Sequence, residues 1–547
     1  MALESQESPG AASISGPVSV SILLALCVPI FLFQLGSYGV VSGDEAFFHG
    51  VAESMVETGN WLSIDFRGEH RPYDTFMNAP LQYWLRAGLI ETFGSNYWTM
   101  RIASASFGVA CVLMTYWMLL PIAGSWPALL AGLIQLTTFQ FVYLHSARSG
   151  VVETALAFLF ALTAHLFMAA IRGRRGFLAH HLCIAALLNL KLPIAIIPLI
   201  AELAYFAIDR DARRLVSKWL LAGIAIAPLA LGWHLYQAFA LDQPATAVLS
   251  RMASQGLGGR GFLAARADNL LFYSGTLLYG TFPYALLYPW AIWTTLRPGN
   301  ESAARSAAAA DWRLFGLFAG SVFAFFVAVG KHSGWYLIPA LPFLSAFLGA
   351  RLAQSMKIGM GRGSRLGLAS FVALLVWVNV GLGVVNPFNP FVASSSANAR
   401  FFSFGGVEAW LGLPLTIAAF ACVIGLLTRW DSNARGAATA LLLFSIGYAA
   451  LRVALPLANT SYASQTEIIW QGLTTARTFD FAVDYPVEVP QGSAISAKTR
   501  FYFAKDFDIV PRDAHPPRAV NGYLLYPKDQ APTPDGNNAA HRDSMRQ

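Results

Sequence analysis

The chain has 547 residues, of which 56% are hydrophobic and only 12% are charged. Soluble domains carry roughly 25% charged residues, so this composition argues against a soluble enzyme and against a disordered chain. The formal net charge of +7 could suit nucleic acid, but most Lys and Arg residues fall in short loops between apolar segments. That distribution indicates membrane topology, so we expect no nucleic-acid partner.

Apolar segments long enough to cross a bilayer as helices recur along most of the sequence. They predict an all-α integral membrane protein with about thirteen transmembrane helices. The predicted spans are residues 18–36, 100–121, 126–143, 151–171, 177–190, 192–208, 215–238, 273–296, 312–330, 335–353, 366–386, 408–428 and 437–457.

The short loops predict the orientation, because cytoplasmic loops of membrane proteins are enriched in Lys and Arg. If residues 1–17 are a cytoplasmic tail, every strongly basic loop falls on the inner side, and residues 458–547 lie outside. This C-terminal tail alternates apolar and polar residues between Pro and Gly, which predicts a small exterior α/β domain with a disordered end. The basic loops are residues 172–175, 209–218, 297–311, 354–365 and 429–435.

Two exterior loops are predicted within the transmembrane domain, residues 18–457. Residues 37–99 are too polar to span a membrane, and their pattern predicts two amphipathic helices, at about 44–58 and 79–94, lying in the outer interface. Residues 239–272 contain several glycines, but no strand precedes them as a dinucleotide site would require. We interpret this second loop as a mobile flap, with an ordinary connecting loop as the alternative.

Charged residues on the exterior side are the candidates for chemistry. Asp44 and Glu45 begin the first amphipathic helix, where acidic residues either stabilise the helix end or act in catalysis. Cations at the ends of spans often extend to the interface, but several on one side with carboxylates nearby suit an anion, most simply the phosphate of a lipid. These cations are Arg67, Arg71, Arg148, Lys191 and Lys331.

Motifs in the first exterior loop carry a more specific resemblance. Asp44-Glu-Ala-Phe-Phe, Glu57-Thr-Gly-Asn-Trp61 and Ala79-Pro-Leu-Gln-Tyr-Trp84-Leu resemble the corresponding loop of GT-C glycosyltransferases. The group they resemble most is the 4-amino-4-deoxy-L-arabinose lipid A transferases, with their relatives in the protein O-mannosyltransferase superfamily. Later segments at Leu190-Lys-Leu-Pro193 and from Lys331 to Pro342 resemble further landmarks of that group in the same order.

The resemblance implies a GT-C fold and a glycosyltransferase that uses a polyprenyl-phosphate sugar donor. The sugar would be an aminopentose or a related sugar, and the acceptor would be lipid A, another glycolipid or another envelope molecule. The resemblance also implies a multi-pass protein of the bacterial inner membrane, in contact with membrane lipid, whose active site faces the periplasm. The alternatives are a protein O-mannosyltransferase-like enzyme and, second, a lipid or sugar transporter.

The same resemblance assigns roles to individual residues. It implies that Asp44 is the catalytic carboxylate with Glu45 beside it, and that Glu153 and His332 lie elsewhere in the cavity. Relatives usually read Glu-Lys-Pro where this chain has Asn78, which can donate a hydrogen bond but brings no charge. The residues implied or expected to contact the donor phosphate are Arg67, Arg71, Asn78, Arg148, Lys191, Lys331 and Tyr336.

The chemistry follows from these residue types. Positioned Arg and Lys side chains can stabilise the charge that develops on a departing polyprenyl phosphate, so no cofactor is required. Asp44 could accept a proton from an acceptor hydroxyl, or orient groups if the acceptor is an ionised phosphate. With one candidate base and no second nucleophile, we expect inversion at the anomeric carbon. Glu45 and His49 share a helical face and could be half of a divalent-metal site, but no further residue completes a ligand pattern.

Overall fold

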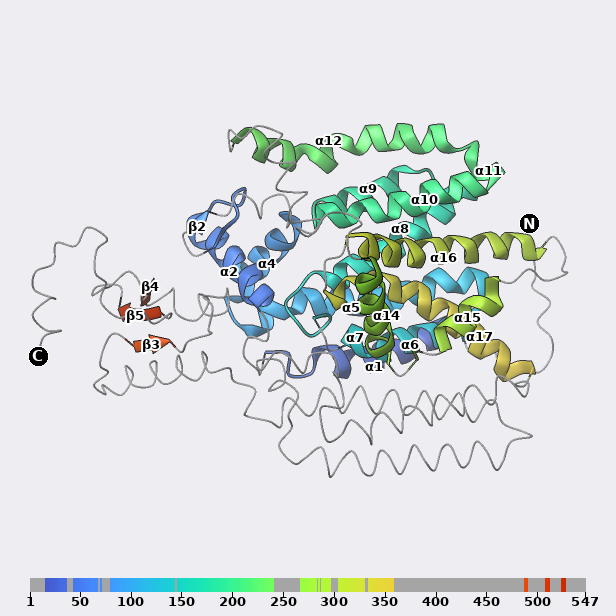
Figure 1. Cartoon of the computed structure of the whole chain (residues 1–547), viewed down its shortest axis with the longest axis horizontal. Helices are drawn as coiled ribbons and strands as arrows, with labels where there is room; N and C mark the ends of the chain where they lie inside the picture. Colours follow the sequence, from blue (N-terminus) through green and yellow to red (C-terminus); the bar gives the residue numbers. More distant parts are fainter. Residues whose placement is uncertain are drawn as a thin grey trace, which may run out of the picture.

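The computed structural model is mainly helical, and its helices form an elongated bundle with α2 and α4 at one end (Figure 1). The residues that the structure describes are 15–36, 43–66, 69–70, 79–142, 145–240, 266–282, 284–285, 287–296, 304–329, 333–358, 487–489, 507–511 and 523–527.

Five helical segments among the described residues are long and apolar enough to cross a membrane. Each coincides with one of the predicted spans, and five such segments indicate a multi-pass membrane protein. These segments lie in α5 (Tyr97–Ala123), α8 (Glu153–Ile171), α12 (Val216–Ala240), α16 (Ala304–Val329) and the continuous pair η3 (Gly334–Ala340) and α17 (Leu341–Ile358).

Other predicted spans consist of shorter or interrupted helices. For example, Pro193 lies in the 3-10 turn η2, which starts the segment that continues as α10. Proline is tolerated there because the first amides of a helix have no partner within the helix. The elements in these spans are α1 (Gly16–Cys27) continuing into the π-helical η1 (Val28–Leu32), α6 (Ser125–Thr137), α7 (Phe139–Val142), α9 (Leu178–Leu188), η2 (Leu192–Ala195) and α10 (Ile196–Ile208). The short α11 (Arg210–Arg213) lies in the predicted basic loop 209–218.

The prediction of a single span at 273–296 is wrong. The structure has two helices there, α14 (Arg266–Gly280) and α15 (Leu287–Leu296), joined by a turn. The sequence places Pro283 between them, and proline can neither supply the amide that continues a helix nor leave its preceding residue free to be helical. The predicted spans 366–386, 408–428 and 437–457 lie outside the described residues, so the total of thirteen stays a prediction.

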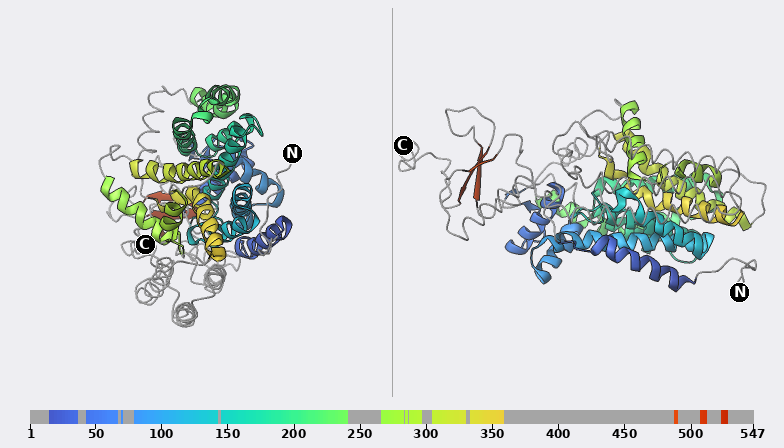
Figure 2. Two further views of the ribbon diagram at one scale, coloured as in Figure 1. Left: turned by 90° about the vertical axis from the view of Figure 1, so that its right-hand side faces the viewer. Right: turned by 90° about the horizontal axis from the view of Figure 1, so that it is seen from below.

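Small residues let the central helices approach closely. A Cβ on Gly349 of α17 would lie 2.6 Å from the backbone nitrogen of Ala131 in α6, and a Cβ on Gly108 of α5 would lie 2.9 Å from the Cβ of Ala147. Helices in lipid gain little from the hydrophobic effect and associate through such close packing. The two further views in Figure 2 show α5, α6, α8 and α17 together in the interior of the bundle.

Helices occupy both stretches of the first exterior loop that the sequence pattern marks as amphipathic. They are α2 (Gly43–Thr58) and α4 (Leu81–Phe93), which pack against each other. Between them, β1 (Asp65–Phe66) and β2 (Glu69–His70) pair antiparallel. The predicted flap at 239–272 is too long at both ends, because α12 runs to Ala240 and α14 begins at Arg266. Its remaining residues, 241–265, lie outside the described residues.

The described part of the C-terminal tail is a three-stranded antiparallel sheet in the order β3-β5-β4. The predicted strand around Tyr523 is present as β5, while residues 500–504 and the predicted disordered end lie outside the described residues. The α/β exterior domain therefore stays a prediction. The strands are β3 (Val487–Val489), β4 (Phe507–Pro511) and β5 (Tyr523–Pro527).

Candidate active site

Four charged side chains from separate parts of the chain form a row of alternating charge. His145 Nε2 lies 3.2 Å from Asp44 Oδ2, and His145 Nδ1 lies 3.4 Å from Glu153 Oε2. Lys191 Nζ continues the row at 3.4 Å from the other oxygen of Glu153, Oε1. The row joins the start of α2, the segment before α8, the first residue of α8 and the turn before η2. Each charge therefore has a neighbour of opposite sign, which reduces the cost of burying it.

Asp44 is the accessible end of this row. Its side chain is 56% exposed, whereas those of His145, Glu153 and Lys191 are 9%, 2% and 12% exposed. Partial desolvation would raise the pKa of Asp44, but the hydrogen bond and positive charge of His145 outweigh it and hold that pKa below its ordinary value. Asp44 is thus a carboxylate that stays ionised at neutral pH and can meet a molecule arriving from outside.

His145 occupies a conformation that few residues adopt. Its φ is +54°, in the left-handed region, which costs of order 1 kcal/mol or more and persists only where surrounding contacts fix it. Its ring stacks on Trp335 of η3, with centroids 4.2 Å apart and planes 9° from parallel. Burial would lower the pKa of His145, but the carboxylates of Glu153 and Asp44 outweigh burial and raise that pKa to about 9. His145 is therefore an imidazolium at neutral pH.

Lys191 forms the inner end of the row. Its ammonium lies 4.9 Å from the centre of the Tyr336 ring as well as beside Glu153. Burial would lower the pKa of Lys191, but Tyr336 and the carboxylates of Glu153 and Asp44 raise it overall, so the side chain stays charged. The structure therefore brings together four of the residues predicted from sequence, Asp44, Glu153, Lys191 and Tyr336.

Glu45 points away from Asp44 into the protein. Its carboxylate is fully buried and pairs with Arg101 of α5, with Nε to Oε1 at 2.7 Å and Nη2 to Oε2 at 3.1 Å. The backbone amide of Gly150 also donates to Oε1 at 2.7 Å. A Cβ on residue 150 would lie 2.9 Å from Glu45 Cγ, so the approach requires glycine. These contacts fix the start of α2, and the catalytic role predicted for Glu45 stays a prediction.

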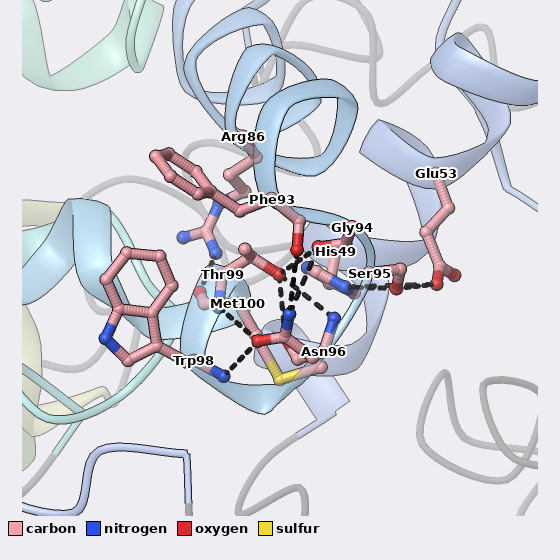
Figure 3. A network of polar contacts seen from close by, with 10 residues as sticks. All are labelled: His49, Glu53, Arg86, Phe93, Gly94, Ser95, Asn96, Trp98, Thr99 and Met100. Atoms are coloured by element: carbon pink, nitrogen blue, oxygen red, sulfur yellow. Dashed lines mark hydrogen bonds and ion pairs between the residues drawn. The ribbon is translucent and has the colours of Figure 1, made fainter.

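A second set of contacts on the same face of α2 fixes its middle (Figure 3). His49 Nε2 lies 2.9 Å from Ser95 Oγ, and the Ser95 hydroxyl donates to Glu53 Oε1. Glu45, His49 and Glu53 are spaced four residues apart, so they lie along one face of the helix. Ser95 belongs to the corner between α4 and α5, where Asn96 accepts hydrogen bonds from the amides of Trp98 and Thr99 and begins α5. The contacts along this polar face fix the position of α2, and therefore the position of Asp44 at its start.

Arg148 also has structural partners. Its guanidinium donates to the carbonyls of Ile30, Phe31 and Phe33 at 2.9–3.2 Å, at the end of η1. Donation to carbonyls that end a helix satisfies groups without an intrahelical partner. The predicted phosphate contact of Arg148 remains untested. Five predicted site residues lie outside the described residues, namely Arg67, Arg71, Asn78, Lys331 and His332.

Sequence reasoning assigned no role to His145 or Trp335. One signal was present, because His145 lies in the same short stretch, residues 145–153, as Arg148 and Glu153, and Trp335 follows Lys331 closely. The contact that matters joins residues far apart along the chain, and no local spacing encodes it. The side chains of Glu45 and His49 do not converge as two ligands of one metal would. Glu45 pairs with Arg101, and His49 contacts Ser95. Within the described residues, no group of three His, Cys, Asp or Glu side chains converges as metal ligands would.

Residues 77–236 match the family described as dolichyl-phosphate-mannose-protein mannosyltransferase. An uncharacterized protein of Aquifex aeolicus is 24% identical over 61% of this chain and 64% of its own length. The undecaprenyl phosphate-alpha-4-amino-4-deoxy-L-arabinose arabinosyl transferase 1 of Pseudomonas fluorescens is 25% identical over 63% of this chain and 59% of its own length. The alignments thus span less than two thirds of these relatives.

Solved structures give the fold. The crystal structure of ArnT from Cupriavidus metallidurans bound to undecaprenyl phosphate superposes with a TM-score of 0.67 and 16% identity, over 89% of this chain and 85% of that one. Its apo structure superposes with a TM-score of 0.61. These matches confirm the fold that the family resemblance implies. The protein is a multi-pass membrane protein with the fold of ArnT.

Proposed function

We propose that this protein is a glycosyltransferase that moves a sugar from a polyprenyl-phosphate donor to lipid A or another cell-envelope acceptor. The donor would be undecaprenyl phosphate carrying an aminopentose or a related sugar. The reaction would take place at the outer face of the bacterial inner membrane. The single observation that carries the proposal is the exposed carboxylate of Asp44, held at the end of the buried row His145, Glu153 and Lys191 in a chain with the fold of ArnT.

Asp44 would act on the acceptor and the anomeric carbon. The bond between that carbon and the carrier phosphate breaks, the phosphate keeps the electron pair, and an acceptor oxygen attacks from the opposite face with inversion. Because Asp44 has a lowered pKa, it is a weak base. We therefore assign it to orienting the acceptor and offsetting the positive charge that develops on the sugar, while the proton of a hydroxyl acceptor passes to water.

Cations would receive the departing phosphate. Lys191 lies behind Asp44 and keeps its positive charge, while Arg67, Arg71 and Lys331 are the exterior cations that the family resemblance adds. A phosphate held by several fixed cations is stabilised most when its charge is greatest, which is after the bond to the sugar has begun to break. This arrangement favours transfer and needs no nucleotide.

The test is mass spectrometry of lipid A, core oligosaccharide and polyprenyl-phosphate sugars from cells that lack the gene. Wild type should restore a sugar-sized mass on one glycolipid, and Asp44→Asn should not. With purified protein, Asp44→Asn should lower the transfer rate by about 10²- to 10³-fold, because the neutral amide no longer offsets the charge on the sugar. Glu91→Gln is the matched control, because Glu91 is an exposed carboxylate on α4 outside the charged row. Equal rates for wild type and Asp44→Asn would refute the assignment of Asp44.

A protein acceptor is the second candidate, and the match of residues 77–236 to a protein mannosyltransferase family favours it. It would use the same carrier with a Ser or Thr hydroxyl as the acceptor. In that case glycolipids would be unchanged in cells without the gene, and glycopeptides would lose a sugar mass. Transfer by purified protein in detergent, where no membrane gradient exists, would rule out a sugar or lipid transporter.

A further inference from the structure

A cavity of about 710 Å³ lies at the end of α8 that is remote from Asp44. The charged row meets α8 at its first residue, Glu153, whereas the cavity begins at Ala170 and Ile171. A helix of 19 residues is about 28 Å long. The cavity therefore lies at the opposite membrane face from the candidate active site and has no part in the chemistry proposed there.

The walls of this cavity combine lipid-facing and cationic side chains. Leu178 of α9 and Leu221 of α12 line it, and they are 53% and 66% exposed. Arg175, in the turn between α8 and α9, and Lys218, in the first turn of α12, line it as well and are both exposed. A soluble anion would gain nothing from exposed leucines, and a neutral lipid would gain little from the cations. The combination of exposed leucines and exposed cations fits an amphiphile with an anionic head group.

The two cations are available to a ligand. Arg172, in the same turn, is paired with Asp311 of α16, which anchors the turn to the bundle. Neither Arg175 nor Lys218 has a carboxylate partner among the residues that the structure describes. The backbone of the turn also leaves room, because a Cβ on Gly173 or Gly176 would meet nothing within 4 Å. The volume falls in the usual range for small-molecule sites, roughly 300–1,000 Å³.

We infer that this cavity binds an anionic phospholipid, with its phosphate between Arg175 and Lys218 and an acyl chain along Leu178 and Leu221. The site is separate from the donor and acceptor sites of the proposed function, so it does not depend on that proposal. The bound lipid would join the turn after α8 to the start of α12, because Arg175 and Lys218 belong to those two segments. A membrane rich in anionic lipid should therefore stabilise this face of the protein.

The experiment is a titration of the full-length purified protein in detergent with phosphatidylglycerol or phosphatidylcholine, read by native mass spectrometry. We expect phosphatidylglycerol to bind more tightly than phosphatidylcholine. Each cation near a lipid phosphate is worth about fivefold in affinity, so Arg175→Gln with Lys218→Gln should weaken binding by roughly thirtyfold. Inorganic phosphate should not displace the lipid, because it lacks the acyl chain.

Two further variants separate this cavity from general lipid contact. Ala225→Trp, on the α12 wall, should weaken phosphatidylglycerol binding by filling the space while leaving both cations. Arg210→Gln with Arg214→Gln removes two exposed cations from α11 and the residue after it, outside the cavity lining, and should leave the affinity unchanged. Equal affinities for wild type, the cation variant and the filled variant would overturn the inference. So would equal binding of the two lipids, or displacement by phosphate.

Discussion

The charge on His145 leads to a prediction that stability measurements can test. His145 lies between two carboxylates, and its pKa is raised from 6.5 to about 9. That difference corresponds to about 3 kcal/mol of tighter proton binding in the folded protein. Because the folded pKa is the higher one, this stabilisation is fully present below about pH 6.5 and is lost as the pH rises through about 9.

The assay is thermal unfolding of wild type and His145→Gln in detergent, followed by tryptophan fluorescence. Near neutral pH the variant should be less stable by up to about 3 kcal/mol, since the neutral amide leaves Glu153 and Asp44 without the imidazolium. Above about pH 9 the two proteins should converge to a smaller difference that reflects the lost stacking on Trp335. Trp335→Leu removes the stacking but keeps the charge, so its deficit should persist at every pH. A deficit of His145→Gln that stays constant with pH would refute the reasoning.

Three substitutions test the interior contacts that fix α2, each by thermal unfolding in detergent. Gly150→Ala would place a Cβ 2.6 Å from the carbonyl oxygen of Met100, and should cost about 1–3 kcal/mol; wild-type stability would contradict the close packing. Glu45→Gln leaves Arg101 buried without its carboxylate and should cost about 3–5 kcal/mol. A loss under 1 kcal/mol, on the order of a surface pair, would show that this ion pair is not buried. Ser95→Ala removes the hydroxyl that contacts both His49 and Glu53, and should lower the free energy of unfolding by about 1–3 kcal/mol. An unchanged free energy of unfolding would mean that this hydroxyl does not join α2 to the corner before α5.

The interior contacts of Glu45 and Arg148 illustrate why sequence reasoning cannot separate catalytic from structural charge. In sequence, Glu45 is the direct neighbour of Asp44, and Arg148 lies between two predicted spans, as Lys191 does. Neighbouring residues on a helix point about 100° apart, so one carboxylate of the pair is exposed while the other is buried against Arg101. Which of the two faces outward depends on how α2 packs, and that packing is set by residues from α5 and the segment before α8.

The sequence by itself determined that this protein is a multi-pass membrane protein with two helices in its first long loop. Hydrophobic length and helical periodicity are local properties, so they can be read from consecutive residues. Its motifs also indicated a family resemblance, and the match to the ArnT structure confirms the fold that this resemblance implies. Only the tertiary structure decided that His145 joins Asp44 to Glu153, and that a cavity with Arg175 and Lys218 lies at the other membrane face. The physical reason is that ion pairs and cavities form between segments distant in the chain, whose distances depend on the packing of the whole bundle.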